Sequence, residues 1–295
     1  MIKTIINTKD INKADVVLLG APYEKTASSH KGTVNGPAKV IECLNTQIEF
    51  FDRKFKAEVA EFVNIAHINL DNLENLSPEN AYQEIKKHSG DLIQKDKFVF
   101  LLGGEHSVCI GNFEALSEKY NPKEITILQI DAHCDLRNDD SDYSEEPSKY
   151  AHSAVMHRAS ELGYNIVQVG IRTYSKEEYE YFSNPENNIK VFEWNKEIIP
   201  VAEILKSITT KYLYITLDVD GFDPACMPGT GTPVQGGLSW YYGLDLIEQA
   251  ISKSELIGAD IVEVSPIADS VLTEYGAAQL IYTIIANKFQ NKLMH

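Results

Sequence analysis

Short apolar runs alternate with longer amphipathic stretches along most of this chain, and that alternation constrains the fold more than any other feature. The apolar runs have the length and composition of buried strands, whereas the stretches between them have the periodicity of helices. We interpret as strands residues 15–20, 97–102, 125–130, 166–170, 212–217 and 256–264. We expect helices over residues 107–120, 175–182, 201–209, 239–251 and 273–288. Strands that alternate with helices form βαβ units, so the sequence predicts an α/β fold whose mostly parallel sheet is covered on both faces.

The chain of 295 residues is predicted to form a single domain, 1–295, because it contains no linker, repeat or low-complexity segment. A hydrophobic fraction of 43% is enough for a sizeable core. No apolar run reaches the roughly 18 residues that a membrane-spanning helix needs, and we see no secretory signal. The cysteines have neither metal-finger nor disulfide-framework spacing: Cys43, Cys109, Cys134 and Cys226. We therefore expect a cytoplasmic protein without a membrane partner.

The formal net charge of the chain is −16 at pH 7. Such an excess of acidic side chains disfavours nucleic acids and anionic membrane surfaces as partners. It favours the approach of a small cationic substrate, although solubility alone would account for the charge equally well.

Acidic side chains and a histidine gather at the predicted ends of two strands. Asp131, His133 and Asp135 follow one strand-like run, and Asp218 and Asp220 follow another. In an extended chain alternate side chains point the same way, so each set can project together from its strand end. Four carboxylates this close repel one another strongly unless cations lie between them. The pattern therefore predicts a metal site, and the number of carboxylates favours two ions.

His106, in the stretch Gly103–Ser107, follows a further strand-like run and is the sixth candidate ligand. Four aspartates balance the charge of two divalent ions, and a ligand set of oxygens with two imidazoles favours Mn²⁺. Taken singly, each of these motifs is also typical of a solvated turn. Their joint occurrence after strand-like runs is what predicts a site with two Mn²⁺ ions per chain.

Two loops border the predicted site. The acidic segment 138–148 is either a solvated surface loop or a rim that favours a positively charged ligand. The segment 223–237 is rich in Pro and Gly, which restrict the backbone and suppress regular structure. Because it follows Asp220 directly, we expect it to form one wall of the site.

Several motifs together resemble those of the ureohydrolases, the family of arginase, agmatinase and their relatives. The matching stretches are Gly103–Ser107, Asp131–Asp135, Asp260–Pro266 and, the longest and most specific, Leu217–Leu238. The resemblance extends from about Asp15 to the last predicted helix. It implies a three-layer α/β/α fold, a centre with two Mn²⁺ ions, hydrolysis of a guanidino group to urea plus an amine, and a homo-oligomer, either a trimer or a hexamer.

The resemblance also implies which ion each candidate ligand would hold. One pair of residues would ligate the first manganese ion, a second pair would ligate the other, and a third pair would bridge both. These pairs are His106 with Asp135, His133 with Asp220, and Asp131 with Asp218.

Three residues are predicted to act on the substrate. His152 matches the family histidine that relays protons, and Glu263 matches the carboxylate that holds the guanidinium. A guanidinium carbon is a poor electrophile, and a pair of metal ions can supply the strong nucleophile that it needs at neutral pH. The departing amine must gain a proton, which Asp135 or His152 would deliver or relay. His157 lies close behind His152, but we expect it to be an ordinary helix residue.

The substrate predicted from the resemblance is agmatine or an agmatine-like cation, with urea and putrescine as the products from agmatine. The stretches Leu136–Asn138 and Lys149–Met156 are similar to agmatinases, whereas arginases continue with residues that hold an α-carboxylate. Segment 138–148 is longer than in agmatinases, so aminopropylagmatine stays open as a substrate. Guanidinobutyrate and arginine are further alternatives, and formiminoglutamate is disfavoured because its site must bind two carboxylates. A metal-binding protein of this fold without activity is the alternative from another class, and the complete set of ligands together with His152 and Glu263 argues against it.

Overall fold

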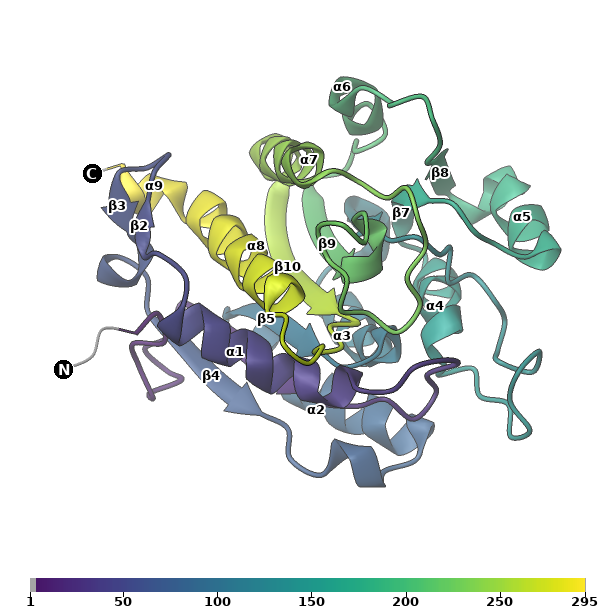
Figure 1. Cartoon of the computed structure of the whole chain (residues 1–295), viewed down its shortest axis with the longest axis horizontal. Helices are drawn as coiled ribbons and strands as arrows, with labels where there is room; N and C mark the ends of the chain where they lie inside the picture. Colours follow the sequence, from purple (N-terminus) through teal and green to yellow (C-terminus); the bar gives the residue numbers. More distant parts are fainter. Residues whose placement is uncertain (1–3, 295) are drawn as a thin grey trace.

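The computed structural model describes residues 4–294 and has an eight-stranded sheet at its centre (Figure 1). The strand order is β4-β1-β5-β10-β9-β6-β7-β8, and every neighbouring pair is parallel. The strands are β1 (Val16–Ala21), β4 (Ile65–Asn69), β5 (Phe98–Gly103), β6 (Ile125–Ile130), β7 (Asn165–Ile171), β8 (Ile189–Glu193), β9 (Tyr212–Asp218) and β10 (Glu255–Val262). A separate antiparallel pair consists of β2 (Phe51–Asp52) and β3 (Ala57–Glu58). The predicted mostly parallel sheet is confirmed.

Helices cover both faces of the sheet. They are α1 (Gly36–Thr46), α2 (Pro78–Gln94), α3 (Cys109–Ser117), α4 (Val155–Glu161), α5 (Lys176–Ser183), α6 (Val201–Leu205), α7 (Trp240–Lys253), α8 (Leu272–Lys288) and α9 (Gln290–Leu293). The apolar sides of α1, α7 and α8 belong to one core, and those of α2, α3 and α4 belong to a second core across the sheet (Figure 1). This three-layer arrangement is the α/β/α fold that the resemblance implied.

Successive side chains of the central strands enter opposite cores, which explains why these strands are continuous apolar runs in the sequence. In β5 the side chains of Phe98, Phe100 and Leu102 enter the core under α1 and α8. Those of Val99 and Leu101 enter the core under α2 and α3. Because successive side chains of a strand point to opposite faces, a strand covered on both faces needs apolar residues at every position.

Of the eight strands of the central sheet, the two that the sequence analysis missed lie at its edges; the short pair β2 and β3 outside this sheet was missed as well. β4 and β8 are the first and last strands in the sheet order. Several of their side chains are only partly buried, and polar residues such as His67 and Lys190 interrupt both runs. An edge strand has less apolar surface to cover than a central one, so the signal that located the central strands is weak there.

The helices differ from expectation at several places. α1, α2 and α9 were not predicted, and α4 was predicted only in that His157 was expected to be a helix residue. Both α1 and α2 carry Pro in their first turn. Proline reads as a helix breaker along a sequence but is tolerated at the first helical position, where its missing N–H has no helical partner. The expected helix over residues 201–209 is shorter, because α6 ends at Leu205.

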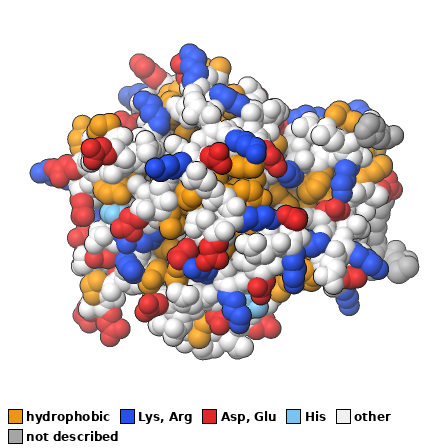
Figure 2. Space-filling view, turned by 180° about the vertical axis from the view of Figure 1, so that it is seen from behind, with side chains coloured by type: hydrophobic (Ala, Val, Ile, Leu, Met, Phe, Trp, Pro, Cys, Tyr) orange, Lys and Arg blue, Asp and Glu red, His pale blue; other side chains and the backbone are white. Residues whose placement is uncertain are grey.

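No helix within residues 4–294 is both long enough and apolar enough to cross a membrane. All four cysteines are free. On the face shown in Figure 2, acidic side chains are interspersed with Lys and Arg, so the net charge of −16 is not concentrated there.

Candidate metal centre and adjoining pocket

Four strands that are consecutive in the sheet deliver the predicted site residues to one edge. These strands are β5, β10, β9 and β6, and parallel strands end at the same side of a sheet. In that order the residues at or after the strand ends are His106, Glu263, Asp218 with Asp220, and Asp131 with His133 and Asp135. The structure thus brings the six candidate ligands into contact distance of one another, and we call these six, without Glu263, the ligand cluster.

Asp131 lies between the two histidines of the ligand cluster. Its Oδ2 is 3.2 Å from Nδ1 of His106, and its Oδ1 is 3.6 Å from Nδ1 of His133. Asp135 lies on the first side, 3.1 Å from His106, and Asp220 lies on the second side, 3.1 Å from His133. Two groups of three potential ligand atoms therefore share Asp131. A carboxylate that bridges two metal ions needs this division, and the outer pairs are those that the resemblance implies.

Asp218 joins the ligand cluster from the end of β9. Its Oδ2 lies 3.6 Å from Nδ1 of His106, and its Oδ1 accepts a hydrogen bond of 2.8 Å from the backbone N–H of Asp220. Burial and then the negative charges of Asp220, Asp131 and Glu263 raise the pKa of Asp218 well above its usual range. Asp218 thus lies where added positive charge is needed, and its bridging role stays a prediction.

The donor atoms of the ligand cluster fit divalent cations. His106 is fully buried, its Nε2 lies 2.9 Å from the hydroxyl of Thr216, and that hydroxyl donates to Asp260 at 2.8 Å. Because the hydroxyl proton goes to Asp260, Nε2 of His106 is the donor, and Nδ1 turns its lone pair towards carboxylate oxygens. Within the described residues this Nδ1 has no hydrogen-bond partner. Lone pairs this close repel, so the cluster requires positive charge between them.

Without metal ions, the pKa values of the ligand cluster show the same need for positive charge. Burial and then the charge of Asp131 raise the pKa of Asp135 to about 7. Burial lowers the pKa of His106, but the nearby carboxylates of Asp131 and Asp135 outweigh it and raise that pKa overall. Protons can therefore supply part of the missing positive charge, and a metal ion that binds here has to displace them.

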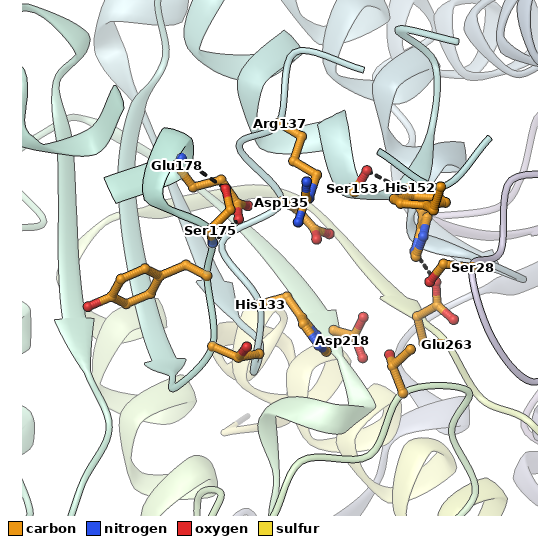
Figure 3. A pocket seen from close by; sticks show the side chains of 14 residues that line it. Ser28, His133, Asp135, Arg137, His152, Ser153, Ser175, Glu178, Asp218 and Glu263 are labelled. Carbon is orange, nitrogen blue, oxygen red and sulfur yellow. Dashed lines mark hydrogen bonds and ion pairs between the residues drawn. The ribbon is translucent and has the colours of Figure 1, made fainter. Parts of the chain in front are cut away.

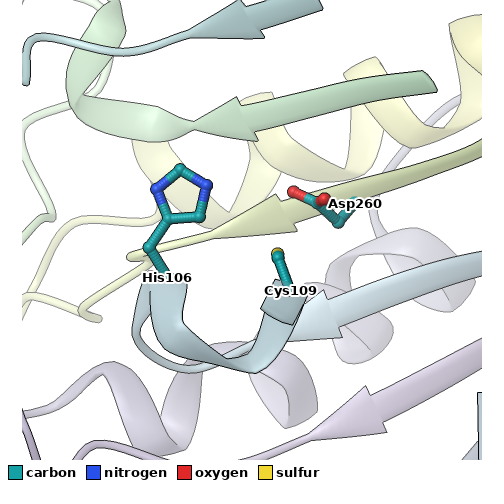
Figure 4. Close-up of side chains that lie close together, drawn as sticks. All are labelled: His106, Cys109 and Asp260. Carbon is teal, nitrogen blue, oxygen red and sulfur yellow. The ribbon is translucent and has the colours of Figure 1, made fainter. Parts of the chain in front are cut away.

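A buried layer behind His106 supports the imidazole ring. Asp260 of β10 and Cys109 of α3 lie close to this ring (Figure 4), are fully buried and do not line the pocket. The three side chains have the composition of a further metal group. Because Nε2 of His106 already contacts Thr216, we interpret the group as support that orients the ring towards the ligand cluster.

The turn after β6 differs from the sequence-based expectation. β6 ends at Ile130, and the N–H of His133 donates to Oδ1 of Asp131 at 2.7 Å, which closes a turn. Asp135 then has a φ of 52°, in the left-handed region. The three side chains were expected to converge because alternate residues of an extended chain share a face. They converge because the chain turns, so that explanation was wrong although the side chains do meet.

A pocket of about 280 Å³ opens beside the ligand cluster (Figure 3). Its lining residues are Ser28, His133, Asp135, Arg137, Tyr143, His152, Ser153, Thr173, Tyr174, Ser175, Glu178, Asp218, Thr232 and Glu263. His152 and Glu263 lie on one side of the cluster, and Ser175 and Glu178 lie on the other. The pocket therefore has carboxylates at two separated positions with the ligand cluster between them.

His152 and Glu263 face each other at one side of the pocket. Nδ1 of His152 lies 3.9 Å from Oε1 of Glu263, which also accepts a hydrogen bond of 2.8 Å from the backbone N–H of His106. Burial and then the charges of His133 and His106 lower the pKa of His152 to about 4. The imidazole of His152 is therefore neutral at pH 7 and can accept a proton.

His157 is a helix residue, as expected. It lies in α4, its Nδ1 contacts the carbonyl oxygen of Leu136 at 2.9 Å, and its ring stacks on Tyr181. It does not line the pocket. These contacts give His157 a role in packing. His152 lines the pocket and His157 does not, so the two histidines have different surroundings although they are close in sequence.

The acidic segment 138–148 does not present its carboxylates to the pocket. Asp140 is buried and accepts a hydrogen bond from the N–H of Ser148, and Asp142 forms an ion pair with Arg137. The segment contributes Tyr143 to the pocket lining instead. The hydroxyl of Tyr143 is 2.6 Å from that of Ser153, and its ring lies edge-on to His152. The interpretation of this segment as an acidic rim is therefore not supported.

Glu178 is the pocket carboxylate that the sequence analysis missed. It is buried at the start of α5, where it forms a capping box with Ser175. Its Oε2 accepts from the N–H of Ser175 at 2.7 Å, and its Oε1 accepts from the N–H of Leu136 at 3.1 Å. The pattern Ser-x-x-Glu was the available signal, because a capping box turns the glutamate back towards the end of the preceding strand.

Comparison with known proteins gives a consistent result. The sequence model of the Arginase family matches residues 14–286. An N(1)-aminopropylagmatine ureohydrolase of Synechocystis sp. is 34% identical over 280 residues, which cover 92% of this chain and 88% of that protein. An agmatinase of Bacillus subtilis is 31% identical over 268 residues, which cover 90% of this chain and 88% of that protein.

A solved structure has the same fold over nearly the whole chain. The agmatine ureohydrolase of Thermoplasma volcanium superposes with a TM-score of 0.85 at 26% sequence identity. The superposition covers 98% of this chain and 95% of that one.

Proposed function

The chain belongs to the arginase family, and from this membership we propose that it is a binuclear manganese ureohydrolase that cleaves agmatine or an aminopropyl-extended agmatine. As an arginase-family ureohydrolase, it is a hydrolase that acts on C–N bonds of guanidino compounds. One observation carries the proposal: two imidazole–carboxylate groups share Asp131 beside a pocket that has a carboxylate on either side. When bound, two divalent ions supply the charge that the ligand cluster lacks and a strong nucleophile at neutral pH.

Glu263 is the residue that we expect to orient the guanidinium. Its Oε1 is held by the backbone N–H of His106, and its backbone has a φ of 63°, so the carboxylate has a defined position at the pocket. A carboxylate forms charge-assisted hydrogen bonds with planar N–H groups, which fixes the plane of the guanidinium. The guanidinium carbon is then presented to the ligand cluster.

His152 and Asp135 are the residues that we expect to handle protons. The bond between the guanidinium carbon and the amine nitrogen breaks, and that nitrogen must gain a proton as it leaves. Both side chains line the pocket, and the pKa of His152 is lowered to about 4, chiefly by burial. A neutral imidazole can take a proton from one side of the pocket and pass it on, whereas Asp135 can donate directly.

Glu178 supports a substrate that carries a second positive charge. Its carboxylate lies across the pocket from Glu263, so an amine at the far end of an agmatine chain would meet a negative charge there. Arg137 is the one Lys or Arg side chain among the described residues of the pocket lining, and Asp142 pairs with it. The α-carboxylate of arginine would therefore find little free positive charge.

The proposal is tested by urea release from agmatine, aminopropylagmatine, guanidinobutyrate and arginine under one Mn²⁺ concentration. We expect the highest kcat/KM for agmatine or aminopropylagmatine. A clear preference for arginine or guanidinobutyrate would refute the substrate. Two bound ions without urea from any of the four would favour a metal-binding protein that lacks this activity.

Metal analysis and light scattering complete the test. We propose Mn²⁺ as the native ion, a trimer or hexamer as the assembly, and the cytoplasm as the location. Metal content after reconstitution should be about two ions per chain. One ion at saturation with full activity would exclude the binuclear mechanism.

A further inference from the structure

A second hollow adjoins the pocket on the side of Glu178. Its volume is about 360 Å³, and it is lined by Ile171, Arg172, Thr173, Tyr174, Glu193, Trp194 and Asn195. Thr173 and Tyr174 also line the pocket beside the ligand cluster, so the two cavities share a wall. We call this second cavity the outer hollow.

The outer hollow is connected to the ligand cluster through the backbone after β7. Thr173 forms a parallel bridge with His133, and its N–H donates to the carbonyl oxygen of Ala132 at 3.2 Å. The same stretch begins α5, which carries Glu178. A ligand that extends from His133 past Glu178 thus reaches Tyr174 and then the outer hollow.

The side chains of the outer hollow suit an organic cation. The hydroxyl of Tyr174 donates to Oε1 of Glu193 at 2.6 Å, and within residues 4–294 we find no cation paired with this carboxylate. Trp194 is mostly buried and contributes an aromatic wall. A carboxylate beside the faces of aromatic rings is a typical binding site for an ammonium group.

The one cationic side chain of this lining is already engaged. The guanidinium of Arg172 donates to backbone carbonyl oxygens, among them those of Asp220 at 2.7 Å and Val234 at 2.6 Å. Burial lowers the pKa of Arg172, and the negative charges of Asp220 and Asp131 oppose this shift. Arg172 therefore holds the loops around the site together, and its hydrogen-bonding groups face backbone carbonyl oxygens.

We propose that the outer hollow binds the terminal ammonium of a guanidino substrate with two amines, of which aminopropylagmatine is the model. The inference rests on the proposed function and goes beyond it by naming the residues that measure substrate length. Glu178 lies where the inner amine of such a substrate would be, and Glu193 lies where the terminal ammonium would be. Agmatine has no second amine, so it would engage Glu178 and leave the outer hollow to water.

The variant that tests this proposal is Glu193→Gln, which removes the negative charge and keeps an oxygen to accept from Tyr174. Glu193 is exposed, so the expected effect is moderate. We expect kcat/KM for aminopropylagmatine to fall about fivefold, through KM, while kcat/KM for agmatine stays the same. The difference should shrink with added salt, because an exposed charge is screened. Glu197→Gln is the matched control, since Glu197 is an exposed carboxylate near the same strand end that does not line the hollow.

Binding measurements separate this inference from the proposed function. The affinities of both compounds for the Mn²⁺-loaded protein are measured by calorimetry, with and without Glu193→Gln. If no urea is released but the wild type prefers the longer cation and the variant loses that preference, the function is wrong and the subsite stands. If urea is released but the variant leaves the ratio of the two substrates unchanged, or weakens both equally, the subsite is wrong.

Discussion

The ligand cluster and the far wall of the pocket, formed by residues 173–178, are built in opposite ways. The ligands of the cluster come in short motifs at strand ends, and most of their side chains are buried, with Asp131 completely so. The far wall comes from the one segment after β7, which lines the pocket with Thr173, Tyr174, Ser175 and Glu178 and follows no metal-ligand motif. The cluster gathers its charges around one point, whereas Glu178 lies apart from it on the other side of the pocket. The cluster should therefore control catalysis, and the wall should control which cation binds.

The largest effect is expected inside the ligand cluster. Asp131→Asn should lower urea release on the order of 10³-fold or more, because metal ions contribute several kcal/mol to such reactions. It should also reduce metal content at both positions, since the two oxygens of Asp131 face different histidines. Asp220→Asn should retain more metal, because Asp220 belongs only to the group of ligands around His133. Two ions and near-normal turnover in Asp131→Asn would contradict a shared carboxylate.

The next effect separates the two neighbouring histidines. His152→Ala should lower kcat by roughly 10²–10⁴-fold, the range for loss of a proton-transfer group, with metal content unchanged. His157→Ala should affect thermal stability more than kcat, because His157 packs against Tyr181. Steady-state kinetics, metal analysis and thermal unfolding of both variants provide the comparison. A larger loss of kcat in His157→Ala would show that the wrong histidine was chosen.

A smaller effect is expected at Glu178 on the far wall. Glu178→Gln removes the charge and leaves one oxygen, so only one of the N–H groups of Leu136 and Ser175 keeps its acceptor. KM for agmatine should rise about tenfold with a smaller change in kcat. A loss confined to binding follows because this group contacts the substrate far from the reacting carbon. Thermal unfolding shows whether the fold is intact. A tenfold loss of kcat with unchanged KM would show that Glu178 acts in catalysis, like the ligand cluster, and not in binding.

The smallest effect is expected from the acidic residues of segment 138–148. Replacing Asp139, Glu145 and Glu146 by their amides should change KM for agmatine less than twofold, because none of them lines the pocket. The measurement is KM at low and at moderate ionic strength. A several-fold increase at low salt that disappears with added salt would restore the interpretation of this segment as an acidic rim.

Much of the fold and the inner part of the site could be predicted, for identifiable reasons. Central strands such as β6 and β9 are buried on both faces, so their continuous apolar runs are visible in the sequence. The candidate ligands follow these runs directly. The edge strands β4 and β8 and the helices α1 and α2 were missed because partial exposure and early prolines weaken the same signals.

The sequence by itself determined the parallel sheet, the three ligand-bearing strand ends and the resemblance that joins them, because each of these is encoded within a few consecutive residues. Tertiary structure alone decided that β10 and β9 lie between β5 and β6, and hence that Glu263 meets His152. It also decided that the acids after Asn138 turn away from the pocket while Glu178 turns towards it. The physical reason is that such contacts depend on the order of strands and on local hydrogen bonds, such as that from Ser175 to Glu178. No periodicity within one segment carries that information.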